Sequence, residues 1–385
     1  MSLARPVVAS LAALLFAGAA AAQEKGNFIV RLGRDTTSVE RYTRTGARVE
    51  VDQVGRAPRV LRRHFIYDFK DGAITRFSMV VTPPGAASPT QTIEAAFTAD
   101  SMMMEVKSGD RPAQQTHMAL PRGTVVVPSS SPWTMYEGQA MKLAGMKGDS
   151  LRATMYLLGG PGPQWLSLHK SGRDSVVLMN EHADIFHLRV DGKGHILGVL
   201  PIAGTGKFSA ERVVSLDLDA YAAAFAAQEK QGAGLGMLSP RDSVVVNAGG
   251  AALWIDYGRP SKRGRVVFGG IVPLGEVWRT GANAATQFKT DKALDFGGTV
   301  VPAGFYTLWT IPSATGWKLV INGETGQWGT EHKAEKDLYT IDMKVSTLPQ
   351  PVERFTIGVE PGEKGGTLDL DWDTTRASVA FTVKP

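Results

Sequence analysis

The chain has 385 residues, a formal net charge of +5 and no cysteine. The lack of cysteine excludes disulfides, thiolate metal sites and a cysteine nucleophile. The length exceeds what one hydrophobic core usually supports, so we expect two domains. The charge is small for this length and gives no reason to expect a nucleic-acid partner.

The first 22 residues have the pattern of a secretory signal peptide. Arg5 precedes an uncharged apolar run, and three alanines, Ala20 to Ala22, precede Gln23. We therefore expect cleavage after Ala22 and an exported protein, either periplasmic or secreted. No later stretch approaches the roughly 20 uninterrupted apolar residues that a membrane span requires, so we expect no transmembrane segment.

An arginine-rich segment follows, because residues 31–63 contain nine arginines and four acids. The segment also alternates apolar and polar residues, which favours arginines on the solvent face of strands. A second interpretation is weak contact of this region with an anionic surface of the cell envelope.

Residues 23–210 predict a β-meander domain of unknown role. The segments 62–70 and 73–81 alternate, and Asp71-Gly72 between them is a strong hairpin signal. Further candidate strands follow at intervals of about 8 to 12 residues, which is typical of an all-β fold. The pattern leaves open whether the meander forms a sandwich, a barrel or a half-barrel.

The pattern changes at residues 211–238, which predict one Ala-rich helix and a Gly-rich linker. An aspartate can cap the helix, Tyr221 and Phe225 lie one turn apart, and glycines end it. Residues 239–385 return to strand signals and predict a β-sandwich. The predicted fold class is therefore all-β, with two antiparallel β domains joined by the helix and linker.

Motifs for phosphate, serine or metal chemistry are absent from the sequence. The stretch GTGKFS, residues 204–209, lacks both the first glycine and the final Ser or Thr of a P-loop, and no Gly-x-Ser-x-Gly occurs. His182 and His187 are an odd number of residues apart, so on one strand they would point to opposite faces. We predict no metal site and no cofactor.

Several long strings in the C-terminal part carry a family resemblance. In chain order they are DYGRPSKRGRVVFGG, VPLGEVWRTGANAAT, VPAGFYTLWTIP, WKLVINGETGQWGT and WDTTRASVAFTV. From about Ser239 to the end, the chain resembles the bacterial family domain of unknown function 2911. The resemblance implies an exported, β-rich protein without an established activity, and it supplies no catalytic residue. We assign no family to residues 27–210.

The most site-like segment is FGGIVPLGEVWRTGANAATQF, residues 268–288. It contains an indole, a forked cation and an amide, which suit a sugar or a carboxylate-bearing ligand. The candidate ligand-binding residues, some from other connections of the same domain, are Tyr257, Arg259, Trp278, Arg279, Asn283, Trp328 and His332. The alternative is a structural corner, in which Trp278 closes the core while Arg279 and Asn283 bond backbone carbonyls.

Two functions follow from these patterns. The first is a non-catalytic envelope or secreted binding module for a small polar, anionic or sugar-like ligand. The alternative is an envelope or extracellular hydrolase whose site is assembled from separate strands. We favour the binding module because no nucleophile has a recognisable context, and we assign no catalytic residue.

Overall fold

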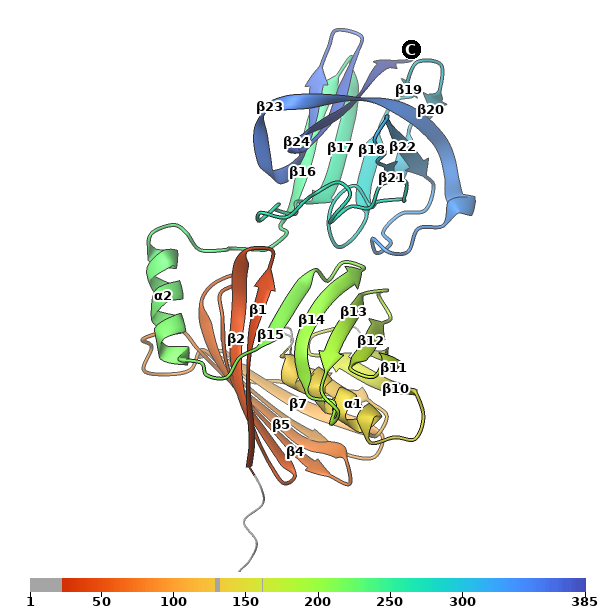
Figure 1. Cartoon of the computed structure of the whole chain (residues 1–385). Helices are drawn as coiled ribbons and strands as arrows, with labels where there is room; N and C mark the ends of the chain where they lie inside the picture. Colours follow the sequence, from red (N-terminus) through yellow and green to blue (C-terminus); the bar gives the residue numbers. More distant parts are fainter. Residues whose placement is uncertain (1–22, 129–131, 161) are drawn as a thin grey trace, which may run out of the picture.

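Strands dominate the computed structural model of the chain, which describes residues 23–128, 132–160 and 162–385. The described strands form two sheets, one in each half of the chain, which confirms the predicted all-β fold (Figure 1). The predicted signal peptide lies outside the described residues. Neither α-helix in the described ranges has both the length and the apolar character that crossing a membrane requires.

The N-terminal sheet has fifteen strands in the described residues. In chain order they are β1 (Gln23–Leu32), β2 (Asp35–Thr45), β3 (Arg48–Gly55), β4 (Leu61–Lys70), β5 (Ala73–Thr82), β6 (Gln91–Phe97), β7 (Ser101–Ser108), β8 (Gln114–Ala119), β9 (Val125–Val127), β10 (Ser150–Leu157), β11 (Pro163–Gly172), β12 (Ser175–Asn180), β13 (Ile185–Val190), β14 (Ile196–Ala203) and β15 (Phe208–Arg212). We call this sheet, with the helix α1 described below, the N-terminal domain.

The N-terminal sheet consists of two meanders, β1 to β8 and β9 to β15, in which strands adjacent in sequence pair with each other. The pairing of β1 with β15 joins the two meanders, so that β8 and β9 form the two edges of the sheet. The predicted hairpin is confirmed: β4 and β5 pair antiparallel, and Asp71 and Gly72 between them both have positive φ. One expectation needs correction. The sheet is not wholly antiparallel, because β9 and β10 pair in parallel across a helical connection.

That connection is α1 (Trp133–Ala144), a helix that the sequence analysis did not predict. Trp133 and Leu143 of α1 are buried in the same core as Phe65 and Leu168 of the sheet. The helix thus fills the interior of the curved sheet (Figure 1), and tertiary packing rather than a periodic local pattern fixes it.

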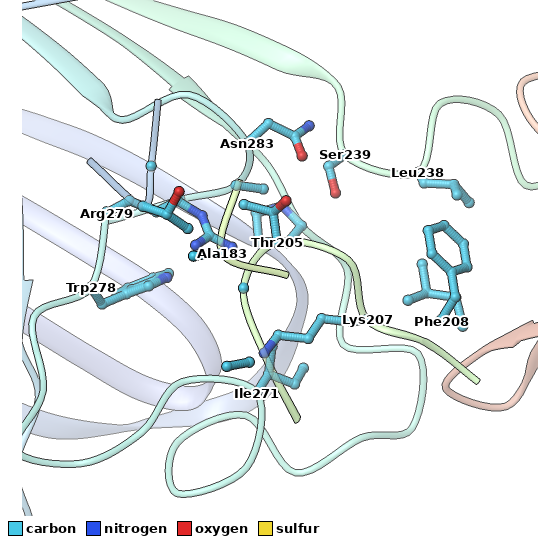
Figure 2. A pocket seen from close by; sticks show the side chains of 18 of the residues that line it. Ala183, Thr205, Lys207, Phe208, Leu238, Ser239, Ile271, Trp278, Arg279 and Asn283 are labelled. Carbon is cyan, nitrogen blue, oxygen red and sulfur yellow. The ribbon is translucent and has the colours of Figure 1, made fainter. Parts of the chain in front are cut away.

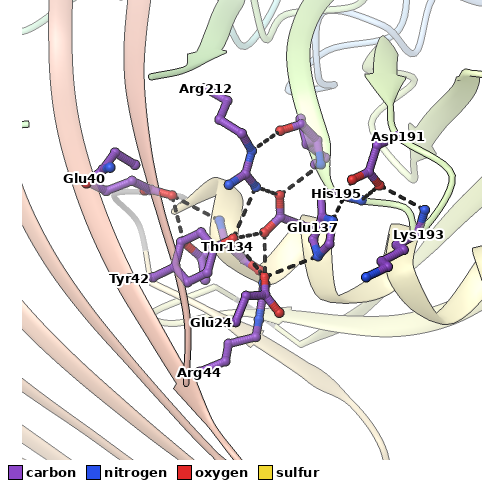
Figure 3. A network of polar contacts seen from close by, with 12 residues as sticks. Glu24, Glu40, Tyr42, Arg44, Thr134, Glu137, Asp191, Lys193, His195 and Arg212 are labelled. Carbon is purple, nitrogen blue, oxygen red and sulfur yellow. Dashed lines mark hydrogen bonds and ion pairs between the residues drawn. The ribbon is translucent and has the colours of Figure 1, made fainter. Parts of the chain in front are cut away.

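A buried carboxylate ties α1 to the sheet (Figure 3). Glu137 accepts hydrogen bonds from the Tyr42 hydroxyl, from Arg44 Nη1 at 2.9 Å and from the Ile196 amide at 2.8 Å. It also pairs with the Arg212 guanidinium. A buried charge is tolerated when its partners satisfy it, and this carboxylate has donors on both oxygens.

The predicted Ala-rich helix is α2 (Leu218–Lys230), which follows the N-terminal sheet. Asp217 caps it, because its carboxylate accepts from the amides of Asp219 and Ala220 at 3.0 and 2.9 Å. Phe225 lies in a small core with Val39 and Val54 of the sheet, so α2 packs on the flank of this domain (Figure 1).

The C-terminal sheet has nine strands, in the order β16-β17-β18-β21-β22-β23-β24-β19-β20. The elements are β16 (Arg241–Ala248), β17 (Ala251–Gly258), β18 (Thr286–Thr290), β19 (Leu294–Asp295), β20 (Val300–Val301), β21 (Gly304–Ile311), β22 (Trp317–Asn322), the 3-10 helix η1 (Ala334–Lys336), β23 (Asp337–Pro361) and β24 (Gly365–Val383). We call this sheet and its loops the C-terminal domain.

The strands β23 and β24 are by far the longest of the C-terminal sheet. Both are continuous, with register shifts near Thr347 and Val352, and they sweep across the other strands (Figure 1). The shifts bend the two strands, so that β23 pairs with β22 at one end and the two strands cover the core at the other. The core of the C-terminal domain includes Trp278, which is stacked on Trp372 with ring centroids 5.9 Å apart.

Candidate functional site

The two domains touch at two separate places. In one, the turn between β1 and β2 meets Arg263: the Arg34 amide donates to the Arg263 carbonyl at 3.1 Å, and Arg263 Nη1 pairs with Asp35 at 2.7 Å. In the other, Thr330 Oγ1 donates to the His182 carbonyl at 3.0 Å. Loops from both domains enclose a cavity of about 690 Å³, within the usual size range of small-molecule sites.

The loop at residues 268–283 forms one wall of this cavity (Figure 2). Trp278 is anchored to β21, because its amide donates to the Thr310 carbonyl at 2.7 Å and its carbonyl accepts from the Thr310 amide at 2.9 Å. Further along, the Asn283 carbonyl accepts from the Gly329 amide at 3.0 Å. The backbone is therefore fixed on both sides of Arg279, whose side chain faces the cavity.

Gly329 makes room for this arginine. A Cβ at Gly329 would overlap both the Arg279 side chain and the Asn283 carbonyl. Only a residue without a side chain lets the two loops approach each other so closely.

The Arg279 guanidinium lacks the partners that a buried cation normally has. Its Nε is buried without a hydrogen-bond partner, and no hydrogen bond or ion pair of the guanidinium occurs within the described residues. Burial lowers the pKa of Arg279 to about 10, and the charge of Asp184 only partly opposes this effect. Arg279 is therefore a cation aimed into a cavity with its anion-binding capacity unused.

A second cation reaches the cavity from the N-terminal domain. The Asp184 carboxylate accepts from the amides of Thr205 and Gly206 at 2.6 and 2.7 Å, and so fixes the turn between β14 and β15 that carries Lys207. Burial, and next the charge of Arg279, lower the pKa of Lys207. Its ammonium group forms no hydrogen bond or ion pair with any part of the chain that the structure describes.

Arg265 contributes a third positive charge to the lining, although its guanidinium bonds the Lys262 and Ser261 carbonyls at 3.0 and 2.6 Å. Burial, and to a smaller extent the charge of Arg263, lower the pKa of Arg265 to about 10. Among the described lining residues there is no Asp or Glu. The charged side chains of the described lining are therefore all positive, and the nearby Asp184 carboxylate offsets part of their charge.

Two further lining residues offer polar atoms. The indole Nε1 of Trp309 is buried and has no hydrogen-bond partner among the described residues. The His332 ring packs against Trp309 with centroids 4.8 Å apart, and its Nε2 contacts Asp337 Oδ1 at 2.9 Å.

Comparison with known families confirms the resemblance of the C-terminal part to domain of unknown function 2911 and gives its bounds. Residues 239–381 match the family model described as Protein of unknown function (DUF2911). Arg265 and Arg279 lie within the DUF2911 match, whereas Lys207 lies outside it, in the N-terminal domain. The cavity thus combines the DUF2911 region with the N-terminal domain, which lies outside that match.

The other comparisons show little similarity to known proteins. No curated protein matches the chain. A solved structure of a DUF1089 family protein from Pseudomonas aeruginosa has 12% sequence identity and a TM-score of 0.32, and the similarity covers 43% of this chain and 90% of that one. A beta-barrel-like protein of domain of unknown function DUF1849 from Brucella abortus has 7% identity and a TM-score of 0.33, covering 50% and 94%.

The structure brings together some of the residues singled out from the sequence. Four of the seven line the cavity, namely Trp278, Arg279, Asn283 and His332. Trp278 also closes the core, as the structural-corner alternative proposed, but Arg279 bonds no carbonyl among the described residues.

The other three lie elsewhere in or beside the DUF2911 region. Tyr257 is buried, and its hydroxyl accepts from the Ile357 amide at 3.0 Å. Arg259 pairs with Asp242 at 2.7 Å, and Trp328 packs against the His182 ring outside the cavity lining.

Sequence reasoning missed Lys207, Arg265 and Trp309. Lys207 stands in the GTGKFS stretch that we tested as a P-loop. The glycines of this stretch indicate a turn, but nothing in it indicates that Lys207 lies beside the C-terminal domain. Only the docking of the two domains brings the cations together.

The arginine-rich segment at residues 31–63 has many partners in the structure. Five of the six arginines on its strands form ion pairs with carboxylates, namely Arg31 with Glu211, Arg41 with Asp52, Arg44 with Glu24 and Glu137, Arg48 with Glu50 and Asp68, and Arg62 with Asp219. These pairs reduce the charge available to an anionic surface. No cluster of three or more His, Asp or Glu suited to a metal ion occurs in the described residues.

Proposed function

We propose that the protein is a non-catalytic binding module for a small anionic molecule, which it holds in the cavity between its two domains. The observation that carries this proposal is the Arg279 guanidinium, which is buried in the cavity wall without a hydrogen bond or ion pair in the described residues. A carboxylate or phosphate supplies the missing partner, because its oxygens match the guanidinium fork.

The energetics favour an anion over a neutral sugar. Burying an unpaired cation costs free energy, which a bound anion recovers. Burial lowers the pKa of both Lys207 and Arg279, and the charge of Arg279 lowers that of Lys207 further. An anion between them converts this repulsion into two attractions, and the surrounding indoles of Trp278 and Trp309 exclude water from the contact.

We also propose that the protein is exported, on the basis of residues 1–22 alone. N-terminal sequencing of the protein expressed in a bacterial host tests this directly. A mature chain beginning at Gln23 in the periplasm or the medium supports export. A full-length chain that stays in the cytoplasm contradicts it.

The anion-binding proposal is tested by thermal unfolding in the presence of acetate, inorganic phosphate and a neutral sugar such as glucose. We expect acetate or phosphate to raise the unfolding temperature and glucose to leave it unchanged, since a ligand that binds only the native state stabilises it by mass action. Ionic strength is held constant with sodium chloride in every sample.

The variant Arg279→Met should abolish the anion-dependent shift. The matched control is Arg259→Met, which also removes one guanidinium from the C-terminal domain, but one that is paired with Asp242 outside the cavity lining. An equal anion shift in the wild type and in Arg279→Met would overturn the proposal, and so would equal loss in both variants.

A further inference from the structure

The cavity has an apolar side as well as a cationic one. Figure 2 places Arg279 and Trp278 at one side of the pocket and Phe208 and Leu238 at the other. The aliphatic chain of Lys207 lies between them, with its ammonium directed back toward the Arg279 side. The two halves of the lining therefore differ in chemistry along one direction.

The apolar side continues to the surface. Ile202 at the end of β14 and Met237 in the linker both line the cavity, and their side chains are 56% and 59% exposed. Val277, beside the aromatic core, is 38% exposed and lines it too. Apolar side chains from both domains and the linker thus converge on one opening, where they remain in contact with water.

We infer that the ligand is an amphipathic anion, with one carboxylate or phosphate head at Arg279 and Lys207 and one apolar chain along Phe208, Leu238 and Ile202. This inference rests on the proposed function, because the head occupies the same cationic end. A compact anion such as phosphate would leave the apolar side hydrated, and a sugar would place hydroxyl groups against it without partners. An alkyl chain removes this apolar surface from water.

Chain length is the quantity that tests the inference. Calorimetric titration of the chain from Gln23 with acetate, hexanoate and decanoate, all below micelle-forming concentrations, measures the dissociation constant for each head-matched probe. Burial of apolar surface should tighten binding by about threefold to fourfold for each methylene that enters the cavity. Decanol and decyltrimethylammonium, which share the chain but not the anionic head, should bind at least tenfold more weakly than decanoate.

The structure offers a closely matched pair of variants on one strand. Ile202 lines the cavity and Leu200, two residues earlier on β14, does not, although its side chain is 62% exposed. Neither substitution removes a core contact, so both proteins should fold. We expect Ile202→Ser to weaken decanoate binding at least threefold with acetate unaffected, and Leu200→Ser to change neither.

The outcomes separate the two proposals. If acetate binds through Arg279 but decanoate binds no more tightly, the inference of an apolar chain fails and the anion site stands. If decanoate and decanol bind equally, the cavity is an apolar site and both proposals fail. Equal effects of Ile202→Ser and Leu200→Ser would also overturn the inference. If none of the carboxylates and no inorganic phosphate binds, the proposed function fails, and this inference with it.

Discussion

Lys207 and Arg279 face one cavity from two different domains, and after burial the charge of Arg279 is the largest influence that lowers the pKa of Lys207. Neither cation has a hydrogen bond or ion pair in the described residues, and the charge of Asp184 only partly offsets the effect of burial on them. Such an arrangement costs stability and is retained where binding requires it. It yields predictions about stability as well as about binding.

Arg279→Met should stabilise the unliganded protein by about 1 kcal/mol, because it removes a desolvated, unpaired charge and keeps most of the apolar packing of the side chain. Urea unfolding at pH 7 measures the change. The paired Arg259→Met should instead lower the free energy of unfolding, since it leaves Asp242 without its partner. A clear loss of stability in Arg279→Met would show that the arginine has a structural role.

Lys207→Gln should weaken binding of a carboxylate about tenfold, which is the usual effect of losing one charge-assisted hydrogen bond. The free energy of unfolding should not fall, because Lys207 forms no ion pair in the described chain and the substitution removes a partly desolvated charge. Calorimetric titration at two salt concentrations measures the affinity and the salt dependence. Unchanged affinity and salt dependence would remove Lys207 from the site.

Gly329→Ala should abolish anion binding although Arg279 is still present. The added methyl group overlaps the Arg279 side chain and the Asn283 carbonyl, so it displaces the guanidinium and costs about 1 to 3 kcal/mol of stability. Gly316→Ala is the matched control, because a Cβ there meets nothing within 4 Å. Normal anion binding in Gly329→Ala would mean that the position of Arg279 is not critical.

Glu40 predicts how the N-terminal domain responds to pH. Its carboxyl accepts from the Thr134 amide and hydroxyl of α1, both at 2.9 Å, and burial raises its pKa from 4.5 to about 7. Between these pH values the folded protein binds more protons than the unfolded chain, so the stability that Glu40 contributes is fully present below pH 4.5 and is lost as the pH rises through 7.

Glu40→Gln should remove this loss, so that its stability relative to wild type increases from pH 5 to pH 8 by up to a few kcal/mol. Urea unfolding across this range measures it. Glu94→Gln, on an exposed position of β6, should retain the wild-type pH dependence. Parallel curves for wild type and Glu40→Gln would show that Glu40 titrates normally in the folded state.

Local patterns predicted much of the fold because they depend on neighbouring residues. Alternation and the Asp71-Gly72 turn gave the β4–β5 hairpin, and Asp217 with the alanines after it gave α2. The helix α1 escaped prediction because its burial inside a curved sheet, not a strong periodic pattern, stabilises it. The continuity of β23 also depends on pairing with distant strands.

The sequence by itself determined the all-β class, the change of pattern near residue 211, the C-terminal family and the prominence of Trp278 and Arg279. Only the tertiary structure decided that Arg279 faces a cavity rather than a carbonyl, and that Lys207 meets it there. These two residues are 72 positions apart and lie in different domains. No local pattern encodes their proximity, because it arises from the docking of two separately packed cores.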